Sequence, residues 1–228
     1  MAQADPAGTG MIERILPDWV AVAESRRDGF EDELYPQERA VVQGAVDRRR
    51  AEFATVRSCA RAALAKLGLP PEPILPGERG APQWPAGVVG SMTHCNGYRA
   101  AALARREQAI SIGVDAEPHA PLPDGVLRLV ARPEELDQLG QLADCPGQLH
   151  WDRLLFTMKE SVYKAWFPLA GRWLDFQQAS VRIDPVAGTF VADLLVPGPQ
   201  LPDGELHGFT GTFLIEDGLA LSAIVLEG

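Results

Sequence analysis

The chain has 228 residues, of which 46% are hydrophobic, and a formal net charge of −10. This length and composition predict a globular protein with a substantial core, organised as one large domain or two small ones. The acidic balance argues against a nucleic-acid-binding protein, and no apolar run is long enough to span a bilayer.

The N-terminal residues predict a cytoplasmic location. Residues 1–10 are polar and lack the basic-then-apolar pattern of a signal peptide. The cysteines, Cys59, Cys95 and Cys145, are odd in number and widely spaced, which argues against a disulfide framework and a paired-cysteine metal site. We expect reduced, mostly buried thiols.

The first half of the chain predicts one or two strands within residues 11–35 and then a long helix over residues 36–67. Pro36 suits a first helical turn, and Gly68 and Pro70 follow its end. This helix carries a cluster of arginines: Arg48, Arg49, Arg50, Arg57 and Arg61. They form either a solvated helix face or a clamp for a small anion, since guanidinium groups match phosphate geometry.

A stiff loop rich in Pro and Gly follows over residues 68–87. Residues 88–92 and 98–104 then predict two strands, joined by a hairpin turn at Asn96-Gly97. Near this turn, the side chains of Ser91, Thr93 and His94 could donate hydrogen bonds to an anion. A lone histidine is nevertheless more often structural.

Residues 111–117 predict a strand on which Asp115 and Glu117 leave the same face, because side chains alternate along a strand. Two neighbouring carboxylates repel each other, and ordinary packing does not require them. Mg²⁺, in contrast, is often held by one or two carboxylates together with substrate phosphates. The pair therefore indicates a divalent-cation site.

Residues 124–142 predict a helical segment interrupted by Pro133, and a stronger helix follows over residues 149–169. Its apolar residues recur at steps of three and four: Trp151, Leu155, Met158, Val162, Trp166 and Leu169. The opposite side carries Arg153, Glu160 and Lys164, with Lys159 nearer the apolar stripe. Alone, Glu160 and Lys164 would be a surface ion pair; beside Asp115 and Glu117, Glu160 would complete a site for a metal-bound phosphate ester.

Four further strands are predicted over residues 178–184, 189–196, 206–215 and 219–226. A helix followed by strands therefore occurs twice along the chain. This order predicts an α+β fold of two similar lobes, 1–113 and 114–228, each with a helix packed on an antiparallel sheet. We expect the lobes to be related by pseudo-twofold symmetry, with the active cleft between them.

The two acidic motifs together resemble the paired signature of the 4′-phosphopantetheinyl transferases, in the larger, two-lobed type that serves polyketide and non-ribosomal peptide synthesis. They are Gly113-Val-Asp115-Ala-Glu117 and Lys159-Glu160-Ser-Val-Tyr-Lys164. Gly90-Ser91-Met-Thr93-His94 and Arg57-Ser-Cys-Ala-Arg61 also resemble segments of this family. Asp115-Ala-Glu117-Pro-His119 and Lys164-Ala-Trp166-Phe-Pro168 are similar to its actinobacterial branch, and the likeness covers roughly residues 36–176.

The resemblance implies that coenzyme A donates its phosphopantetheine arm to a serine of an apo acyl or peptidyl carrier protein, releasing 3′,5′-ADP. Asp115, Glu117 and Glu160 would hold Mg²⁺, with Mn²⁺ also possible. Asp115, Glu160 and Lys164 would be catalytic, and either Glu160 or a metal-bound water would take the serine proton. The resemblance further implies these contacts to coenzyme A: Arg49, Arg57, Arg79, Ser91, Thr93, His94, Lys159 and Lys164.

One departure concerns the loop before Trp84, where relatives often carry a lysine. Pro76 stands there in this chain, and Arg79 is the candidate substitute.

A monomer would suffice, and we expect neither a nucleic-acid nor a membrane partner. Carrier proteins are usually acidic, so we expect a locally apolar or basic docking surface, with the candidates Val126, Leu127, Arg128, Leu129 and Arg132.

Two other functions fit part of this pattern. A Mg²⁺-dependent hydrolase of coenzyme A or nucleotide pyrophosphates would share the metal and the substrate but would use water. The Glu-rich helix of the Nudix pattern, which would favour this alternative, is not found in the sequence. A carrier-protein-binding or nucleotide-binding module with purely structural carboxylates is the second alternative.

Overall fold

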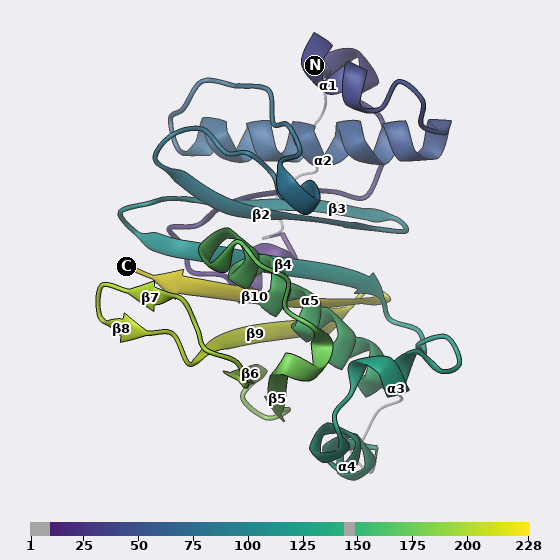
Figure 1. Ribbon diagram of the computed structural model, residues 1–228. Coiled ribbons are helices and arrows are strands. Elements are labelled where there is room, and N and C mark those ends of the chain that lie inside the picture. The colour runs from purple at the N-terminus through teal and green to yellow at the C-terminus, as the bar shows by residue number, and fades with distance from the viewer. Residues whose placement is uncertain (1–9, 144–148) are drawn as a thin grey trace.

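The computed structural model describes residues 10–143 and 149–228. Its main elements are two helices, α2 (Asp47–Lys66) and α5 (Trp151–Ala170), a three-stranded sheet and a five-stranded sheet. In Figure 1, α2 lies above the three-stranded sheet, and α5 passes in front of the five-stranded sheet. Both sheets are antiparallel, and each is covered on its outer face by one of the 20-residue helices. The predicted α+β class is confirmed, whereas the pseudo-twofold relation stays a prediction.

The three-stranded sheet has the order β1 (Ala21–Ser25), β3 (Tyr98–Arg105) and β2 (Val88–Cys95). The predicted hairpin between β2 and β3 is confirmed, and Gly97 supplies the positive φ of 76° that its turn requires. The predicted helix over residues 36–67 is instead two helices, α1 (Pro36–Val41) and α2. Gly44 lies in the break between them and lowers the helical propensity there.

The five-stranded sheet has the order β4 (Ala109–Pro118), β10 (Leu219–Glu227), β9 (Gly208–Glu216), β6 (Thr189–Leu194) and β5 (Ala179–Asp184). These strands confirm the predictions made for the second half of the chain, with small shifts at their ends. The short pair of strands β7 (Gln200–Leu201) and β8 (Gly204–Glu205) was not predicted.

The remaining helices are short. The predicted break at Pro133 separates α3 (Val126–Val130) from α4 (Pro133–Leu142), with the proline in the first turn of α4. Four segments form 3-10 helices: η1 (Ile12–Ile15), η2 (Glu31–Glu33), η3 (Glu78–Gly80) and η4 (Phe176–Gln178). Within the described parts of the chain, no helix has the length and apolar character needed to cross a membrane.

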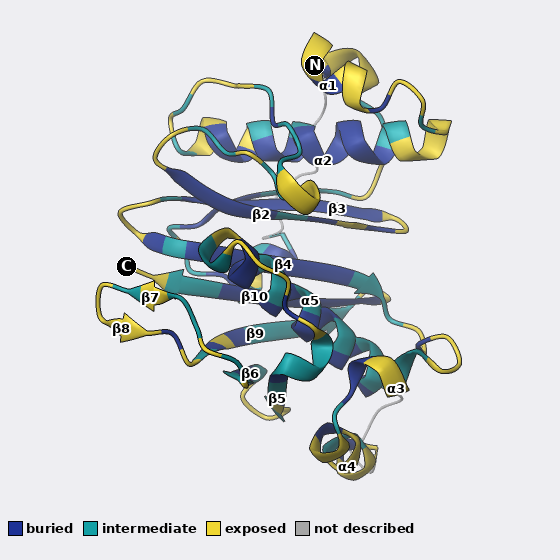
Figure 2. Cartoon of the chain, viewed as in Figure 1, coloured by how far each residue is buried: buried dark blue, intermediate teal, exposed yellow. Residues whose placement is uncertain are grey.

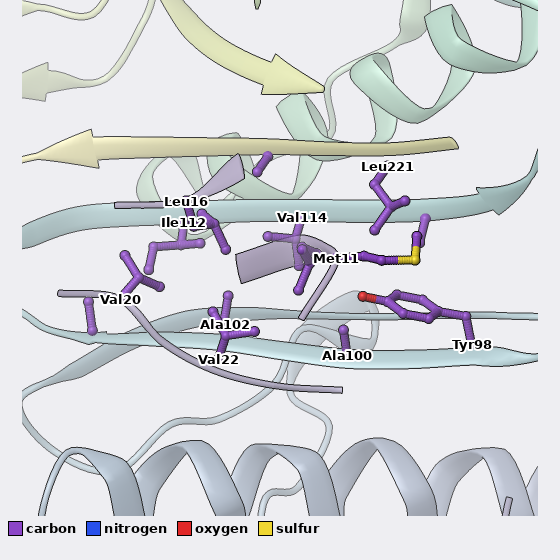
Figure 3. Close-up of a cluster of buried hydrophobic side chains, with 14 of the residues drawn as sticks. Met11, Leu16, Val20, Val22, Tyr98, Ala100, Ala102, Ile112, Val114 and Leu221 are labelled. Carbon is purple, nitrogen blue, oxygen red and sulfur yellow. The ribbon is translucent and has the colours of Figure 1, made fainter. Parts of the chain in front are cut away.

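Strand β4 is buried on both faces, and its alternation positions the acidic motif. Its even-numbered side chains, such as Ile112 and Val114, enter the core between the two sheets, where Figure 3 shows them facing Val22 and Ala102. Its odd-numbered residues face α5: the hydroxyl of Ser111, for example, donates to the carbonyl oxygen of Ala165. Asp115 therefore points toward the polar side of α5.

The burial pattern agrees with this arrangement. In Figure 2, α2 is dark blue along the face that covers the sheet, whereas α4 is largely exposed. Cys59 and Cys95 are buried free thiols, as predicted, and Cys145 lies outside the described residues. The predicted division between residues 113 and 114 falls inside β4, which pairs with β10 along its length. We propose the preceding turn, residues 106–108, as the boundary instead.

Candidate active site

A cavity of about 770 Å³ lies between α2, the loop over residues 76–84, β2 and α5. Its cationic lining comes from both halves of the chain, with Arg49 and Arg57 on α2 and Lys164 on α5. Apolar side chains, including Phe53 and Trp84, line the rest. A cavity with cationic groups on an apolar wall suits a ligand that has both phosphates and a less polar arm.

Asp115 and Lys164 meet beside this cavity. The Lys164 ammonium donates to Oδ1 of Asp115 at 2.6 Å and to the carbonyl oxygen of Val114 at 3.1 Å. Asp115 is buried, and burial raises the pKa of its carboxyl group, while the Lys164 charge opposes this shift. The second oxygen, Oδ2, is buried and has no hydrogen-bond partner within the described structure.

Glu117 and Glu160 lie close enough to Asp115 for the three charges to interact. Burial raises the pKa of Glu160, and the negative charges of Asp115 and Glu117 raise it further. Burial also raises the pKa of Glu117, and the charge of Asp115 adds to this effect. Carboxylates that raise one another's pKa values would be stabilised by a nearby cation, so this group is a candidate cation site.

The three carboxylates do not yet surround a common point. Among the residues that the structure describes, no three His, Cys, Asp or Glu side chains are gathered closely enough to hold a metal ion. Cations of the chain itself occupy part of this region, because Lys164 pairs with Asp115 and Arg153 pairs with Glu117 at 3.2 Å. A divalent cation would therefore compete with these two ion pairs.

Arg49 and His94 form a second polar group in the lining of the cavity. The Arg49 guanidinium lies 2.9 Å from Nε2 of His94. Arginine can only donate, so Nε2 accepts and the imidazole is neutral. Burial, aided by the Arg49 charge, lowers the pKa of His94 to about 4. The Glu52 carboxylate lies 3.8 Å from both groups and offsets the cationic charge.

Arg57 and Arg79, both predicted to contact the ligand, also line the cavity. Arg57 is buried, stacks on the ring of Phe53 and donates to the carbonyl oxygen of Ile74 at 2.8 Å. Arg79 is exposed and lies over the ring of Trp173, which follows α5. Arg57 is thus held by two contacts within the first half of the chain, whereas Arg79 contacts the segment that follows α5.

Ser91 and Thr93 line the cavity, but their hydroxyl groups are engaged within the protein. Ser91 Oγ accepts the backbone N–H of Val114 at 3.1 Å, and Thr93 Oγ1 accepts that of Ala116 at 3.0 Å. The edge of β4 is thus joined to β2 by side chains instead of a backbone ladder. Accepting these bonds leaves each hydroxyl proton free to be donated. Thr93 lies 3.2 Å from Oδ1 of Asp115, which competes with the predicted donation to a ligand phosphate, whereas Ser91 can still make that donation.

Lys159 differs most from its expected place. Its ammonium is buried on the other side of α5, 2.7 Å from Glu135, and also donates to the carbonyl oxygens of Phe176 and Ala179. It does not line the cavity described above. The helical position was predicted correctly, but the carboxylate that pairs with Lys159 comes from α4, and sequence spacing could not reveal it. We therefore assign Lys159 a structural role.

Replacing Lys159 by Met tests this role. The change should lower the free energy of unfolding by about 3–5 kcal/mol, because it leaves the Glu135 carboxylate buried without its partner. Urea denaturation measures this, and the double variant with Glu135→Gln should recover part of the loss. An unchanged stability together with a raised KM for coenzyme A would instead support the phosphate contact.

Two charged residues near the site, Glu52 and Arg153, were not assigned a role from the sequence. Glu52 contacts Arg48, Arg49, Arg99 and His94. Its spacing of three and four residues from the arginines on one helix could have indicated this cluster. Arg153 was placed on the polar side of the predicted helix, seven residues before Glu160. Because this spacing is about two helical turns, it could have indicated that Arg153 lies on the same face as Glu160.

Two family models match most of the chain. A model described as the 4′-phosphopantetheinyl transferase N-terminal domain matches residues 37–104, and a model of the 4′-phosphopantetheinyl transferase superfamily matches residues 111–204. The two matches are separated by residues 105–110, which include the turn before β4, and together they include the arginines of α2 and the acidic motifs.

Three similar proteins carry the same description. The chain is 54% identical to the 4′-phosphopantetheinyl transferase Svp of Streptomyces mobaraensis, over 95% of this chain and 89% of that protein. It is 49% identical to the transferase Npt of Nocardia iowensis, over 94% and 99%. It is 47% identical to the transferase PptT of Mycobacterium tuberculosis, over 84% and 85%. All three organisms are actinobacteria, as the resemblance implied, and the chain belongs to the 4′-phosphopantetheinyl transferase superfamily of enzymes.

Proposed function

We propose that this enzyme transfers the 4′-phosphopantetheine arm of coenzyme A to a serine hydroxyl of apo acyl or peptidyl carrier proteins, releasing 3′,5′-ADP. The observation that carries the proposal is the meeting of Asp115 on β4 with Lys164 on α5, at the wall of a cavity that Arg49 and Arg57 also line. The cavity would therefore offer a phosphorylated ligand positive charge from α2 and from α5.

Coenzyme A fits the chemistry of the cavity lining. Guanidinium groups bind phosphates well, so Arg49 and Arg57, with neutral His94 beside them, are assigned to the 3′-phosphate end. Lys164 is assigned to the diphosphate, close to the reacting phosphorus. Arg79, which also lines the cavity, is assigned to a further contact with coenzyme A, where it would take the place of the lysine found in relatives.

A divalent cation, Mg²⁺ or Mn²⁺, fits the carboxylates. Oδ2 of Asp115 is a buried oxygen that has no partner among the described residues, and burial together with the charge of Asp115 raises the pKa values of Glu117 and Glu160, which supports a cation beside them. Asp115, Glu117 and Glu160 would hold the cation against the diphosphate oxygens. The cation would supply neutralisation of charge on those oxygens.

The side chains of this enzyme would mainly position the substrates and balance charge. Phosphoryl-type transfer needs little covalent help from the protein. Lys164 would neutralise charge that develops on the leaving 3′,5′-ADP. Glu160, whose pKa burial raises, is the protein group suited to accept the proton of the attacking serine. The nucleophile comes from the carrier protein, so the enzyme needs none of its own.

The carrier protein is assigned to the surface around α3, where Leu129 and Arg128 are exposed. This surface adjoins α5 through η4, because the Gln177 side-chain amide donates to the carbonyl oxygens of residues 129–131. An exposed leucine next to a cation suits an acidic partner with an apolar contact.

Replacing Arg128 by Glu should raise the KM for an acidic carrier protein by about tenfold at low salt, because rim charges mainly govern association. The KM for coenzyme A should not change. Arg27→Glu, which makes the same charge change on the exposed loop after β1, serves as the control. Steady-state assays at two salt concentrations measure the effect, and an equal response of the two variants would exclude this docking surface.

The proposed reaction is tested by mixing the enzyme with coenzyme A, Mg²⁺ and an apo carrier protein and weighing the carrier by mass spectrometry. A mass gain of one phosphopantetheine group supports the transferase. Cleavage of coenzyme A without a carrier mass gain would favour a hydrolase, and unchanged carrier and coenzyme A would favour a binding module. A carrier whose acceptor serine is replaced by Ala is the matched control.

A further inference from the structure

The hydroxyl group of Thr93 lies between the backbone of β4 and the carboxylate of Asp115. It accepts the N–H of Ala116 at 3.0 Å and lies 3.2 Å from Oδ1 of Asp115. A threonine hydroxyl has one proton to donate, and the amide nitrogen of Ala116 can only donate. The Thr93 proton is therefore directed to Asp115, and the orientation of this hydroxyl is fixed by its two partners.

Thr93 and Lys164 both donate to the same oxygen of Asp115. Lys164 Nζ lies 2.6 Å from Oδ1, and Thr93 adds the second hydrogen bond to that atom. Oδ2 is left buried without a partner in the part of the chain that is described. A buried carboxylate oxygen without a partner is costly, so its occurrence in an enzyme calls for a ligand.

We propose that Thr93 is a positioning residue for the divalent-cation site: it fixes the carboxylate of Asp115 through Oδ1 and so keeps Oδ2 available for the cation. This inference rests on the proposed function, because the cation site belongs to it. It also replaces the expected contact between Thr93 and a coenzyme A phosphate. Partners that orient a metal-binding carboxylate typically change metal affinity by about 10–100-fold when they are removed.

Ser91 provides a matched comparison on the same strand. Its hydroxyl accepts the N–H of Val114 at 3.1 Å, so it joins β2 to β4 in the same way two residues earlier. Ser91 and Thr93 are both buried. Of these two hydroxyl groups, however, only that of Thr93 is within hydrogen-bond distance of the Asp115 carboxylate in the described structure. The two residues therefore both join the sheets, but only Thr93 also contacts Asp115.

The experiment compares Thr93→Val, Thr93→Ser and Ser91→Ala with the wild-type enzyme. Mn²⁺ is titrated into each protein and followed by electron paramagnetic resonance, first alone and then with saturating coenzyme A. Urea unfolding is measured in parallel. Thr93→Val and Ser91→Ala should both lower the unfolding midpoint, because each leaves a buried amide of β4 unpaired.

Only Thr93→Val should weaken Mn²⁺ binding, by about tenfold or more, and Thr93→Ser should stay within about twofold of wild type. Wild-type affinity in Thr93→Val, or an equal loss in Ser91→Ala, would overturn the inference. Should Thr93→Val fail to fold, Thr93→Cys gives the same comparison, because a thiol is a weak donor.

The same titration separates this inference from the proposed function. A wild-type enzyme that binds Mn²⁺ neither alone nor with coenzyme A would overturn the cation site and, with it, the role of Thr93. Transfer of phosphopantetheine to a carrier, assayed on the same preparation, reports on the proposed function independently of any Thr93 variant.

Discussion

Replacing Asp115 by Asn should lower kcat/KM for phosphopantetheine transfer by about 10³-fold or more. The loss of one group that stabilises developing charge typically costs about 10²–10³ in rate. Asp115 is expected to exceed this, because it pairs with Lys164 and would also hold the cation. Asparagine keeps the shape of the side chain but loses its charge, so both interactions weaken together.

The stability of the Asp115→Asn variant should be unchanged or higher, which distinguishes a site residue from a structural one. Burial raises the pKa of Asp115, so its charged form is disfavoured in the folded state and destabilises the free enzyme at neutral pH. Removing that charge removes the cost. Steady-state kinetics and urea unfolding check both parts, with Asp137→Asn on the exposed face of α4 as control. Retained activity in Asp115→Asn would refute the assigned role.

The elements of the fold that could be predicted are those with strong local signals. The apolar stripe of α5 and the Asn96-Gly97 turn between β2 and β3 are encoded within a few residues, and both predictions are confirmed. The break at residues 42–46 was missed because one glycine, Gly44, lowers helical propensity without forcing an end. Strands β7 and β8 were missed because two-residue strands carry too little periodicity.

The candidate site was predictable where side chains project from regular elements. Alternation along β4 put Asp115 and Glu117 on one face, and helical spacing put Glu160 and Lys164 on one side of α5. The position of Lys159 on its helix was equally clear, but its partner Glu135 comes from α4. Residues that reach their partners across two elements depend on tertiary packing, and local spacing does not encode that.

The hydroxyl groups of Ser91 and Thr93 illustrate the same limit. Their position near a turn indicated donors for an anion, and the structure uses both as acceptors for the amide groups of β4. This use follows from the junction of two sheets whose edge strands, β2 and β4, are not paired through their backbones. A sequence read one element at a time does not show which strand edges will meet.

Replacing Gly113 by Ala should have the second large effect, on stability and activity together. A Cβ atom at Gly113 would lie 2.0 Å from the carbonyl oxygen of Ser161 and 2.8 Å from the amide nitrogen of Ala165. Both are backbone atoms of α5, so a rotamer change cannot relieve the clash. Overpacking a core costs about 1–3 kcal/mol, and a clash with backbone should reach or exceed the upper value.

The same clash should reduce transfer activity, because Gly113 sets the distance between the two elements that carry the site. Asp115 and Glu117 follow Gly113 on β4. On α5, Glu160 and Lys164 directly precede the residues that Gly113 approaches. A displacement near 1 Å can cost about 10²-fold in rate when groups must be aligned. We therefore expect Gly113→Ala to lower kcat/KM by at least about 10²-fold in the fraction that remains folded.

Gly140→Ala is the control for this variant, because a Cβ at Gly140 meets open space within helix α4. Alanine is the better helix former there, so the control should gain about 0.5–1 kcal/mol and keep full activity. Urea unfolding and transfer kinetics on both variants make the comparison. Wild-type stability in Gly113→Ala would mean that α5 and β4 can separate without cost. The close approach that brings the carboxylates to Lys164 would then not be a fixed feature of the enzyme.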